Sequence, residues 1–299
     1  MTDIIIKKLN ESFIHINCSS DIAYELSEAF TFDVDGAKYT PLYKSGQWDG
    51  KIRIFKIGKR TMPHGLLDEV IAFAKQRSYT VLDDTRITQN HITLQDVMDY
   101  INTLGLTTRS DPITVRDYQI QGIYQALRNK RGILLAATGS GKSMILGVIA
   151  RYMTEVLKLR VLIIVPTIGL TSQMRADFAD YFGHTGWSAQ DQCHCITAGV
   201  SKDTDKPIVI STFQSIYKMD SKWLDKFGCM IADEAHKIIA KTITGIFECA
   251  TKTEYKLGCT GTLQDMNCNQ LVKRGITGPV YDIASTADLI KNGQLVPLN

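Results

Sequence analysis

The sequence has little of what marks secreted, membrane-spanning or strongly charged proteins. Its seven cysteines are an odd number and contain no Cys-x-x-Cys pair, which argues against a disulfide framework and a ribbon-type zinc site. No apolar stretch approaches the roughly 18 residues of a membrane-spanning helix, and the start lacks the basic-then-apolar order of a signal peptide. The net charge is only +3, so any basic binding surface must be a local patch. We therefore expect a cytoplasmic protein with reduced thiols and no membrane partner.

The pattern of apolar residues divides the 299-residue chain into two parts. Over residues 1–110, short strand and helix patterns mix, which predicts a small α+β accessory domain. Over residues 111–285, apolar runs alternate regularly with helical stretches, which predicts an α/β fold with a parallel sheet covered on both faces. In such a sheet the functional residues lie at the carboxyl ends of the strands. The strands expected in this second part are 133–137, 161–165, 193–197, 208–211, 230–233 and 257–260.

Two local patterns in the first part are specific enough to predict structure. We expect residues 39–43 and 51–57 to pair as a hairpin around the glycine turns between them. Thr93 and Asp96 have the spacing of a capping box, which predicts the start of an amphipathic helix.

The most informative motif is a glycine-rich loop that follows an apolar run and opens a helix. Its residues are Thr138, Gly139, Ser140, Gly141, Lys142 and Ser143. The glycines allow positive φ and close backbone approach, while the loop N–H groups and the helix N-terminus attract phosphate. Lys142 would reach the terminal phosphates and Ser143 would give a hydroxyl to Mg²⁺. Ala136 stands where a strict pattern has glycine. We predict a site for ATP with Mg²⁺.

Two adjacent acids follow a buried strand, at Asp233 and Glu234. Asp233 suits the Mg²⁺ shell opposite Ser143, and Glu234 suits a base that orients and deprotonates the attacking water. With Lys142, this pair makes one half of an ATP-hydrolysing site. The alternative is a pair of solvated acids placed favourably at a helix N-terminus.

The order of these motifs resembles superfamily 2 helicases, with Gly-Ser-Gly-Lys-Ser as motif I and Asp-Glu-Ala-His as motif II. The resemblance covers about residues 113–299 and implies a RecA-like P-loop NTPase lobe. It implies that Arg116, Tyr118 and Gln119 recognise adenine, and that His236 links the nucleotide to motif III.

Three further segments match the family in order. Pro166 and Thr167 resemble motif Ia, and Thr212 and Gln214 resemble motif Ib, both of which contact a nucleic-acid strand in the family. Thr212 could equally cap a helix. The segment that resembles motif III, which couples hydrolysis to movement, is Thr260, Gly261 and Thr262.

The chain as a whole, accessory part included, resembles the amino-terminal part of a recombination and fork-remodelling helicase of T-even bacteriophages. That resemblance implies an ATP-dependent DNA helicase acting on branched or duplex DNA in recombination, replication and repair, located in the host cytoplasm. Recombination or replication proteins would be its partners. An RNA helicase, a restriction-type translocase subunit and a nucleotide-gated binding module remain open, because these motifs do not separate DNA from RNA.

The family places a second lobe after the first, and that lobe supplies arginines to the transferring phosphate. We expect residues 286–299 to be the connection to such a lobe. An arginine finger contributes about 10³ to 10⁵ in rate, so we expect this chain to bind nucleotide but to hydrolyse it weakly or not at all.

Basic and aromatic residues interleave between residues 38 and 60, where Asp49 is the only acid. Lys51 and Arg53 would project from one face of a strand toward phosphates, and Trp48 could stack on a base. The alternative is a solvated edge strand protected by its lysines, with Trp48 packed against the core.

Overall fold

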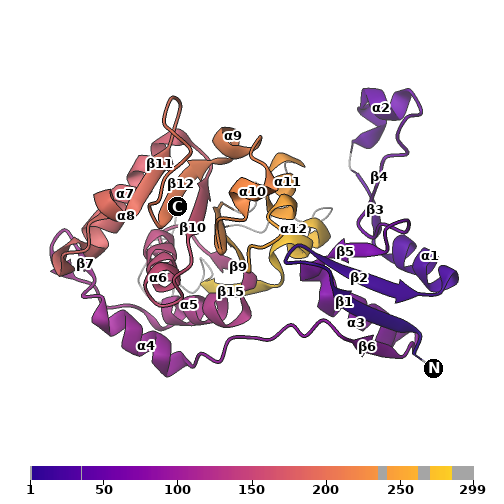
Figure 1. Ribbon diagram of the computed structural model, residues 1–299, viewed down its shortest axis with the longest axis horizontal. Coiled ribbons are helices and arrows are strands. Elements are labelled where there is room, and N and C mark those ends of the chain that lie inside the picture. The colour runs from indigo at the N-terminus through magenta and orange to yellow at the C-terminus, as the bar shows by residue number, and fades with distance from the viewer. Residues whose placement is uncertain (1, 35, 235–240, 262–269, 285–299) are drawn as a thin grey trace, which may run out of the picture.

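The computed structural model describes residues 2–34, 36–234, 241–261 and 270–284. Within them the strands form a four-stranded mixed sheet, a seven-stranded parallel sheet and two small antiparallel pairs. Figure 1 shows the two larger sheets side by side, each with its own helices. No helix of the described residues combines the length and the apolar character needed to cross a membrane.

The accessory unit is built on the four-stranded sheet, whose order is β5-β2-β1-β6. Every second residue of β1 and β2 is buried, because one face of the sheet packs on two helices. Ile4, Ile6, Ile14 and Ile16 on this face are fully inaccessible to solvent. The elements are β1 (Ile4–Lys8), β2 (Phe13–Cys18), α1 (Ser20–Ala29), β5 (Thr61–Pro63), η2 (His64–Leu66), α3 (Leu67–Gln76) and β6 (Val81–Asp83).

An arm, residues 31–34 and 36–53, projects from this unit (Figure 1). It consists of β3 (Thr31–Asp33), η1 (Ala37–Tyr39), α2 (Pro41–Lys44) and β4 (Lys51–Arg53). The expected hairpin of residues 39–43 with 51–57 is wrong, because β4 pairs with β3 instead. The local reason is that Pro41 begins α2 while the Thr40 hydroxyl accepts the Tyr43 N–H, which turns this stretch into a capped helix.

The seven-stranded sheet has the order β11-β12-β10-β13-β14-β9-β15, and all its pairs are parallel. The α/β class and the expected strands are confirmed, whereas β15 was not expected from the sequence. The strands are β9 (Arg131–Ala136), β10 (Val161–Val165), β11 (Cys193–Ile196), β12 (Ile208–Thr212), β13 (Cys229–Asp233), β14 (Tyr255–Thr260) and β15 (Val280–Ala284).

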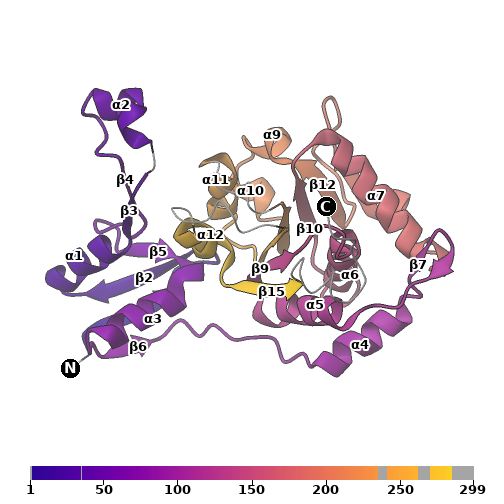
Figure 2. The ribbon, with the colours of Figure 1, turned by 180° about the vertical axis from the view of Figure 1, so that it is seen from behind.

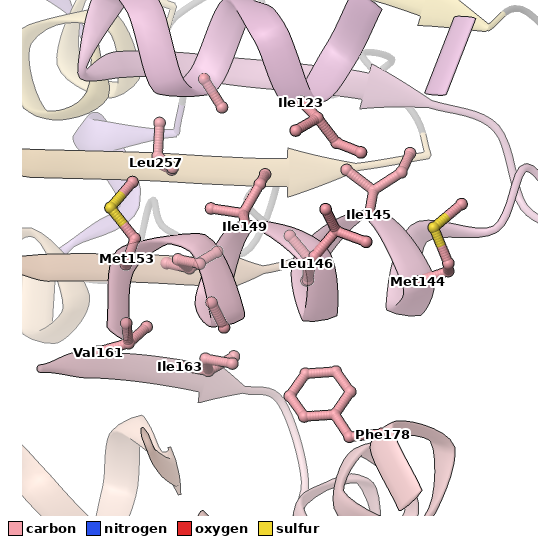
Figure 3. Close-up of a cluster of buried hydrophobic side chains, with 14 of the residues drawn as sticks. Ile123, Met144, Ile145, Leu146, Ile149, Met153, Val161, Ile163, Phe178 and Leu257 are labelled. Atoms are coloured by element: carbon pink, nitrogen blue, oxygen red, sulfur yellow. The ribbon is translucent and has the colours of Figure 1, made fainter. Parts of the chain in front are cut away.

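Helices cover both faces of this sheet. The core on one face contains Leu134 and Ile163, and the core on the other contains Ile133 and Leu162, so neighbours along each strand point to opposite sides. Figure 3 shows the first core, where Ile145 and other α6 residues face the strands. Its helices are α4 (Leu94–Thr103), α5 (Asp117–Asn129), α6 (Lys142–Glu155), α7 (Ile168–Phe182) and α8 (Ala189–Gln192); the other face has α9 (Phe213–Ile216), α10 (Ser221–Leu224), α11 (Lys241–Cys249) and α12 (Gln270–Thr277).

Helix α4 belongs by packing to the large sheet. The capping box of Thr93 and Asp96 is confirmed at its start, and Val97 and Ile101 lie in the same core as Ile123 of α5. An extended segment joins β6 to α4 along the edge of the molecule (Figure 2). The next residues form the small pair β7 (Thr107–Thr108) and β8 (Asp111–Pro112).

Buried polar contacts join the accessory unit to the large sheet. Lys256 of β14 donates from Nζ to Ser12 Oγ at 2.6 Å and to the Phe247 carbonyl at 2.7 Å. Arg131 of β9 donates to the backbone carbonyls of Glu11 and Ile276. Burial lowers the pKa of Lys256 to about 6, because desolvation and the nearby Arg131 both disfavour the charged ammonium.

The backbone of the two units also meets directly at Gly65. A Cβ at this position would lie 2.1 Å from the Arg274 carbonyl oxygen and 2.8 Å from the Gly278 nitrogen, both backbone atoms. Arg274 also pairs with Glu69 of α3 at 2.6 Å. The joint therefore tolerates no side chain at Gly65.

We predict that Gly65→Ala lowers the free energy of unfolding by about 1–3 kcal/mol, because α12 must shift to admit the methyl group. Urea unfolding followed by circular dichroism measures this. Gly58→Ala is the matched control, since a Cβ there meets nothing within 4 Å. Equal stability of the two variants would contradict the close approach.

Candidate nucleotide site

The expected site residues meet at one edge of the seven-stranded sheet. Strand β14 lies between β13 and β9, and its register sets Cys259 beside Asp233 and Thr260 beside Leu135. The carboxyl ends of these three parallel strands therefore bring motifs II, III and I together.

The phosphate loop has the backbone that its glycines predict. Gly139 and Gly141 have φ values of 83° and 84°, and α6 begins at Lys142. Ala136 is still the last residue of β9 and is fully buried, so the position where a strict pattern has glycine does not need positive φ here. The Ser140 hydroxyl is buried without a hydrogen-bond partner in the described part of the chain. Thr138 is exposed at the loop tip.

Lys142 and Glu234 face each other across the site. Lys142 Nζ lies 3.6 Å from Glu234 Oε1, and both side chains are partly buried. A Cβ on Gly261 would lie 3.2 Å from Lys142 Nζ, so motif III presses its bare backbone against the phosphate-loop lysine. The Glu234 N–H donates to Asp233 Oδ1 at 3.0 Å, and Glu234 has φ of 53°. Glu234 therefore has a strained, left-handed backbone directly after β13. Strain of this kind in a residue other than glycine is often found at functional sites.

The oxygen ligands that the site offers fit a hard cation. The Ser143 hydroxyl and the Asp233 carboxylate are oxygen ligands of the kind that Mg²⁺ takes. Asp177 and Tyr181 of α7 lie near the Ser143 side chain, and burial raises the pKa of both. Sequence reasoning missed these two residues, because nothing in the pattern of α7 marks them and the packing of α6 on α7 brings them to Ser143.

The expected adenine-binding residues support the loop. The Gln119 amide donates to the Ser140 carbonyl at 2.8 Å, and its oxygen accepts the Arg116 N–H at 2.9 Å. The Tyr118 hydroxyl donates to the same Ser140 carbonyl at 3.1 Å and accepts from the Arg116 guanidinium. Gln119 is almost completely buried. Its base-reading role stays a prediction; its structural role is to hold the phosphate loop.

Strand β15 also supports the loop, and sequence reasoning missed it. The Ala137 N–H, just before the loop, donates to the Ala284 carbonyl at 3.0 Å. Ile283 packs against Gly122 of α5, where a Cβ would come within 2.7 Å of it. Val280 and Ile283 are the only β-branched residues in this short strand, which is too weak a pattern to predict a strand from sequence.

The residues expected to contact nucleic acid form two groups. Val165 pairs with Thr212, so Pro166 and Thr167 leave the sheet beside motif Ib. Thr212 is buried and its hydroxyl caps α9 by accepting the Ser215 N–H, which is the alternative left open for it. Thr167 and Gln214 are exposed at this edge.

The second group lies on the arm. Lys51 and Arg53 are exposed on β4, with Asp33 and Asp49 as ion-pair partners, while Ile52 is half-buried between them. The Trp48 indole donates to the Lys51 carbonyl at 2.9 Å, which fixes the ring. His236, Thr262 and residues 286–299 lie outside the described residues.

A parallel sheet with a phosphate loop, an acidic pair and a motif III glycine around one lysine defines the first, RecA-like lobe of a superfamily 2 helicase. The chain belongs to the family described as "Type III restriction enzyme, res subunit", whose model matches residues 112–265. The family model "DNA helicase UvsW, N-terminal" matches residues 3–84.

Known relatives agree with this assignment. The ATP-dependent DNA helicase uvsW of Enterobacteria phage T4 is 32% identical over 294 residues, covering 96% of this chain and 57% of the relative. The crystal structure of the UvsW helicase from bacteriophage T4 matches with a TM-score of 0.86 at 30% identity, covering 94% of this chain and 100% of that one. A DNA 3'-5' translocase XPB2 of Sulfurisphaera tokodaii is 27% identical over 189 residues, which is 63% of this chain and 40% of the translocase. The chain thus spans little more than half of the first curated relative.

We predict that Gln119→Ala weakens nucleotide binding about tenfold, because its hydrogen bond to the Ser140 carbonyl of the phosphate loop and its bond to the Arg116 N–H are both lost. Titration with a fluorescent ATP analogue measures the affinity. Gln121→Ala removes an exposed glutamine from the same helix and should leave it unchanged. Equal affinities of the two variants would contradict a supporting role for Gln119.

Proposed function

We propose that this chain is the ATP-binding half of a DNA-dependent ATPase of helicase type that acts on branched DNA. The observation that carries this is the meeting of Lys142, Glu234 and Gly261 within one phosphate site. A pure nucleotide-gated binder has no use for a general base at Glu234, so this geometry favours an enzyme.

The site residues divide the work of hydrolysis. Lys142 and the loop N–H groups neutralise and position the terminal phosphates. Ser143 and Asp233 would hold Mg²⁺, which when bound neutralises charge that develops on the phosphates. Glu234 orients the attacking water and takes its proton. Gly261 touches Lys142 and is therefore placed to couple the phosphate site to neighbouring strands, with His236 and Thr262 proposed for the same task.

The DNA contacts would come from two surfaces. Thr167 and Gln214, with Pro166 and Thr212 behind them, would contact strand backbone at the edge of the sheet. The arm would add Trp48, Lys51 and Arg53. The names of the relatives specify DNA, which supports DNA over RNA, and recombination or replication proteins would be the partners.

We propose a different division between the two parts from that expected at residue 110. The buried residues of the accessory core lie between Ile4 and Ala74, with Val272 of α12 packed against them, while the core on the α4 face of the large sheet begins at Ile92. A boundary within the extended segment 84–91 separates these cores.

Two substitutions test the phosphate site. We expect Lys142→Ala to lower ATP affinity about 10- to 100-fold, because a charge-assisted contact is lost. Glu234→Gln should keep the affinity and abolish turnover. Nucleotide titration and steady-state phosphate release measure these, with Lys252→Ala as an exposed control. Turnover by Glu234→Gln equal to that of the unaltered chain would contradict the role of Glu234.

The arm has its own test. We expect Lys51→Ala combined with Arg53→Ala to weaken binding to forked DNA and to flatten its salt dependence, because fewer counterions are released. Fluorescence anisotropy at several salt concentrations measures both quantities. The control is Lys7→Ala with Lys75→Ala, two exposed lysines outside the arm. An unchanged affinity at low salt would make the arm a protected edge rather than a DNA contact.

A further inference from the structure

A cavity of about 890 Å³ separates the arm from the large sheet's helices. The arm contributes Leu42, Trp48 and Ile52 to it, and α11 and α12 contribute Glu248 and Val272. Its volume lies within the range of small-ligand sites. The cleft therefore lies between the accessory unit and the lobe that carries the phosphate site.

The walls of the cleft are apolar. Phe13, Ile54, Pro63 and Ile276 line it, and each is buried or half-buried in the core beneath. Trp48 lines the same cleft and is only partly buried, with its indole N–H bound to the Lys51 carbonyl. A held aromatic ring in an apolar cleft suits a flat aromatic occupant.

Three exposed cations line the same cleft, namely Arg53, Lys56 and Lys59. Arg53 pairs with Asp49, and Lys56 donates to the Arg53 carbonyl at 2.7 Å. Glu248, on the facing helix, is the one carboxylate among the lining residues. Burial raises its pKa, and Lys56 opposes this. The positive charge of the three cations favours an anionic occupant, and the aromatic wall favours one that is also aromatic. The Glu248 carboxyl could hydrogen-bond the polar edge of that occupant.

Helix α11 links the cleft to the proposed DNA edge. It forms one wall of the cleft and packs on α9, and α9 follows Thr212 in motif Ib. Figure 1 shows α9 and α11 near each other on the side of the large sheet that faces the arm. A strand that follows these helices from motif Ib would lead toward the cleft.

We propose that the cleft between the arm and α11 receives an unpaired base of a branched DNA strand, stacked on Trp48 with its phosphate near Lys56 and Lys59. This rests on the proposed function. The base stacks for any sequence, so the cleft selects single-stranded positions at a branch rather than a sequence.

The test uses the full chain and forked DNA that carries 2-aminopurine at one position in turn around the branch point. We expect the fluorescence of one unpaired position to fall on binding, because the base stacks on the indole. Trp48→Ala should abolish this change and weaken fork binding about tenfold, with a much smaller loss of plain duplex affinity. Trp48→Phe should retain it, and Thr244→Trp, which fills the cleft from α11, should abolish it.

Tyr24→Ala removes an exposed aromatic ring outside the cleft and is the matched control. A probe signal that is the same in all variants overturns the base site and leaves DNA binding intact. Equal loss of fork and duplex affinity in Trp48→Ala, without a position-specific signal, also overturns it, since the arm then contacts only backbone. Trp48 emission that shifts with chain concentration alone assigns the cleft to a second copy instead. If the chain binds neither forked nor duplex DNA, the proposed function is contradicted as well.

Discussion

The burial of β14 between β13 and β9 is the constraint on which the site depends. Its register sets Cys259 beside Asp233 and Thr260 beside Leu135, so Gly261 arrives against Lys142. At its other end, Lys256 reaches through to Ser12 of the accessory unit. One strand therefore runs from the phosphate site to the joint between the two units. A shift of β14 along its axis would change both the Gly261–Lys142 contact and the Lys256–Ser12 hydrogen bond.

The phosphate loop is held by more of the protein than its own motif. Gln119 and Tyr118 hold the Ser140 carbonyl from α5, and Ala284 of β15 holds Ala137. The groups of the loop used in these contacts are the Ser140 carbonyl and the Ala137 N–H before the turn, so the N–H groups that face phosphate stay available. Positioning of this kind suits phosphoryl transfer, where catalysis is mostly geometry and charge neutralisation.

The two surfaces proposed for DNA have different physical characters. The motif Ia and Ib edge offers exposed polar groups just after strand ends, as at Thr167, which precedes α7, and at Gln214 in α9. The arm offers cations and a fixed indole on a projecting element joined to the core by β3 and β4. The apolar cleft lies between the arm and helices α11 and α12, so backbone contact and base contact would be assigned to different parts of the protein.

The sequence by itself determined the local features whose physics is local. Positive φ at Gly139 and Gly141, the Thr93–Asp96 capping box and the apolar strands of the parallel sheet were all predictable, because each depends on residues next to one another in the chain. The tertiary structure alone decided which strand pairs with β4, that β15 supports the loop, and that Asp177 and Lys256 reach Ser143 and Ser12. These depend on contacts between residues far apart in the chain, whose energies no local pattern contains.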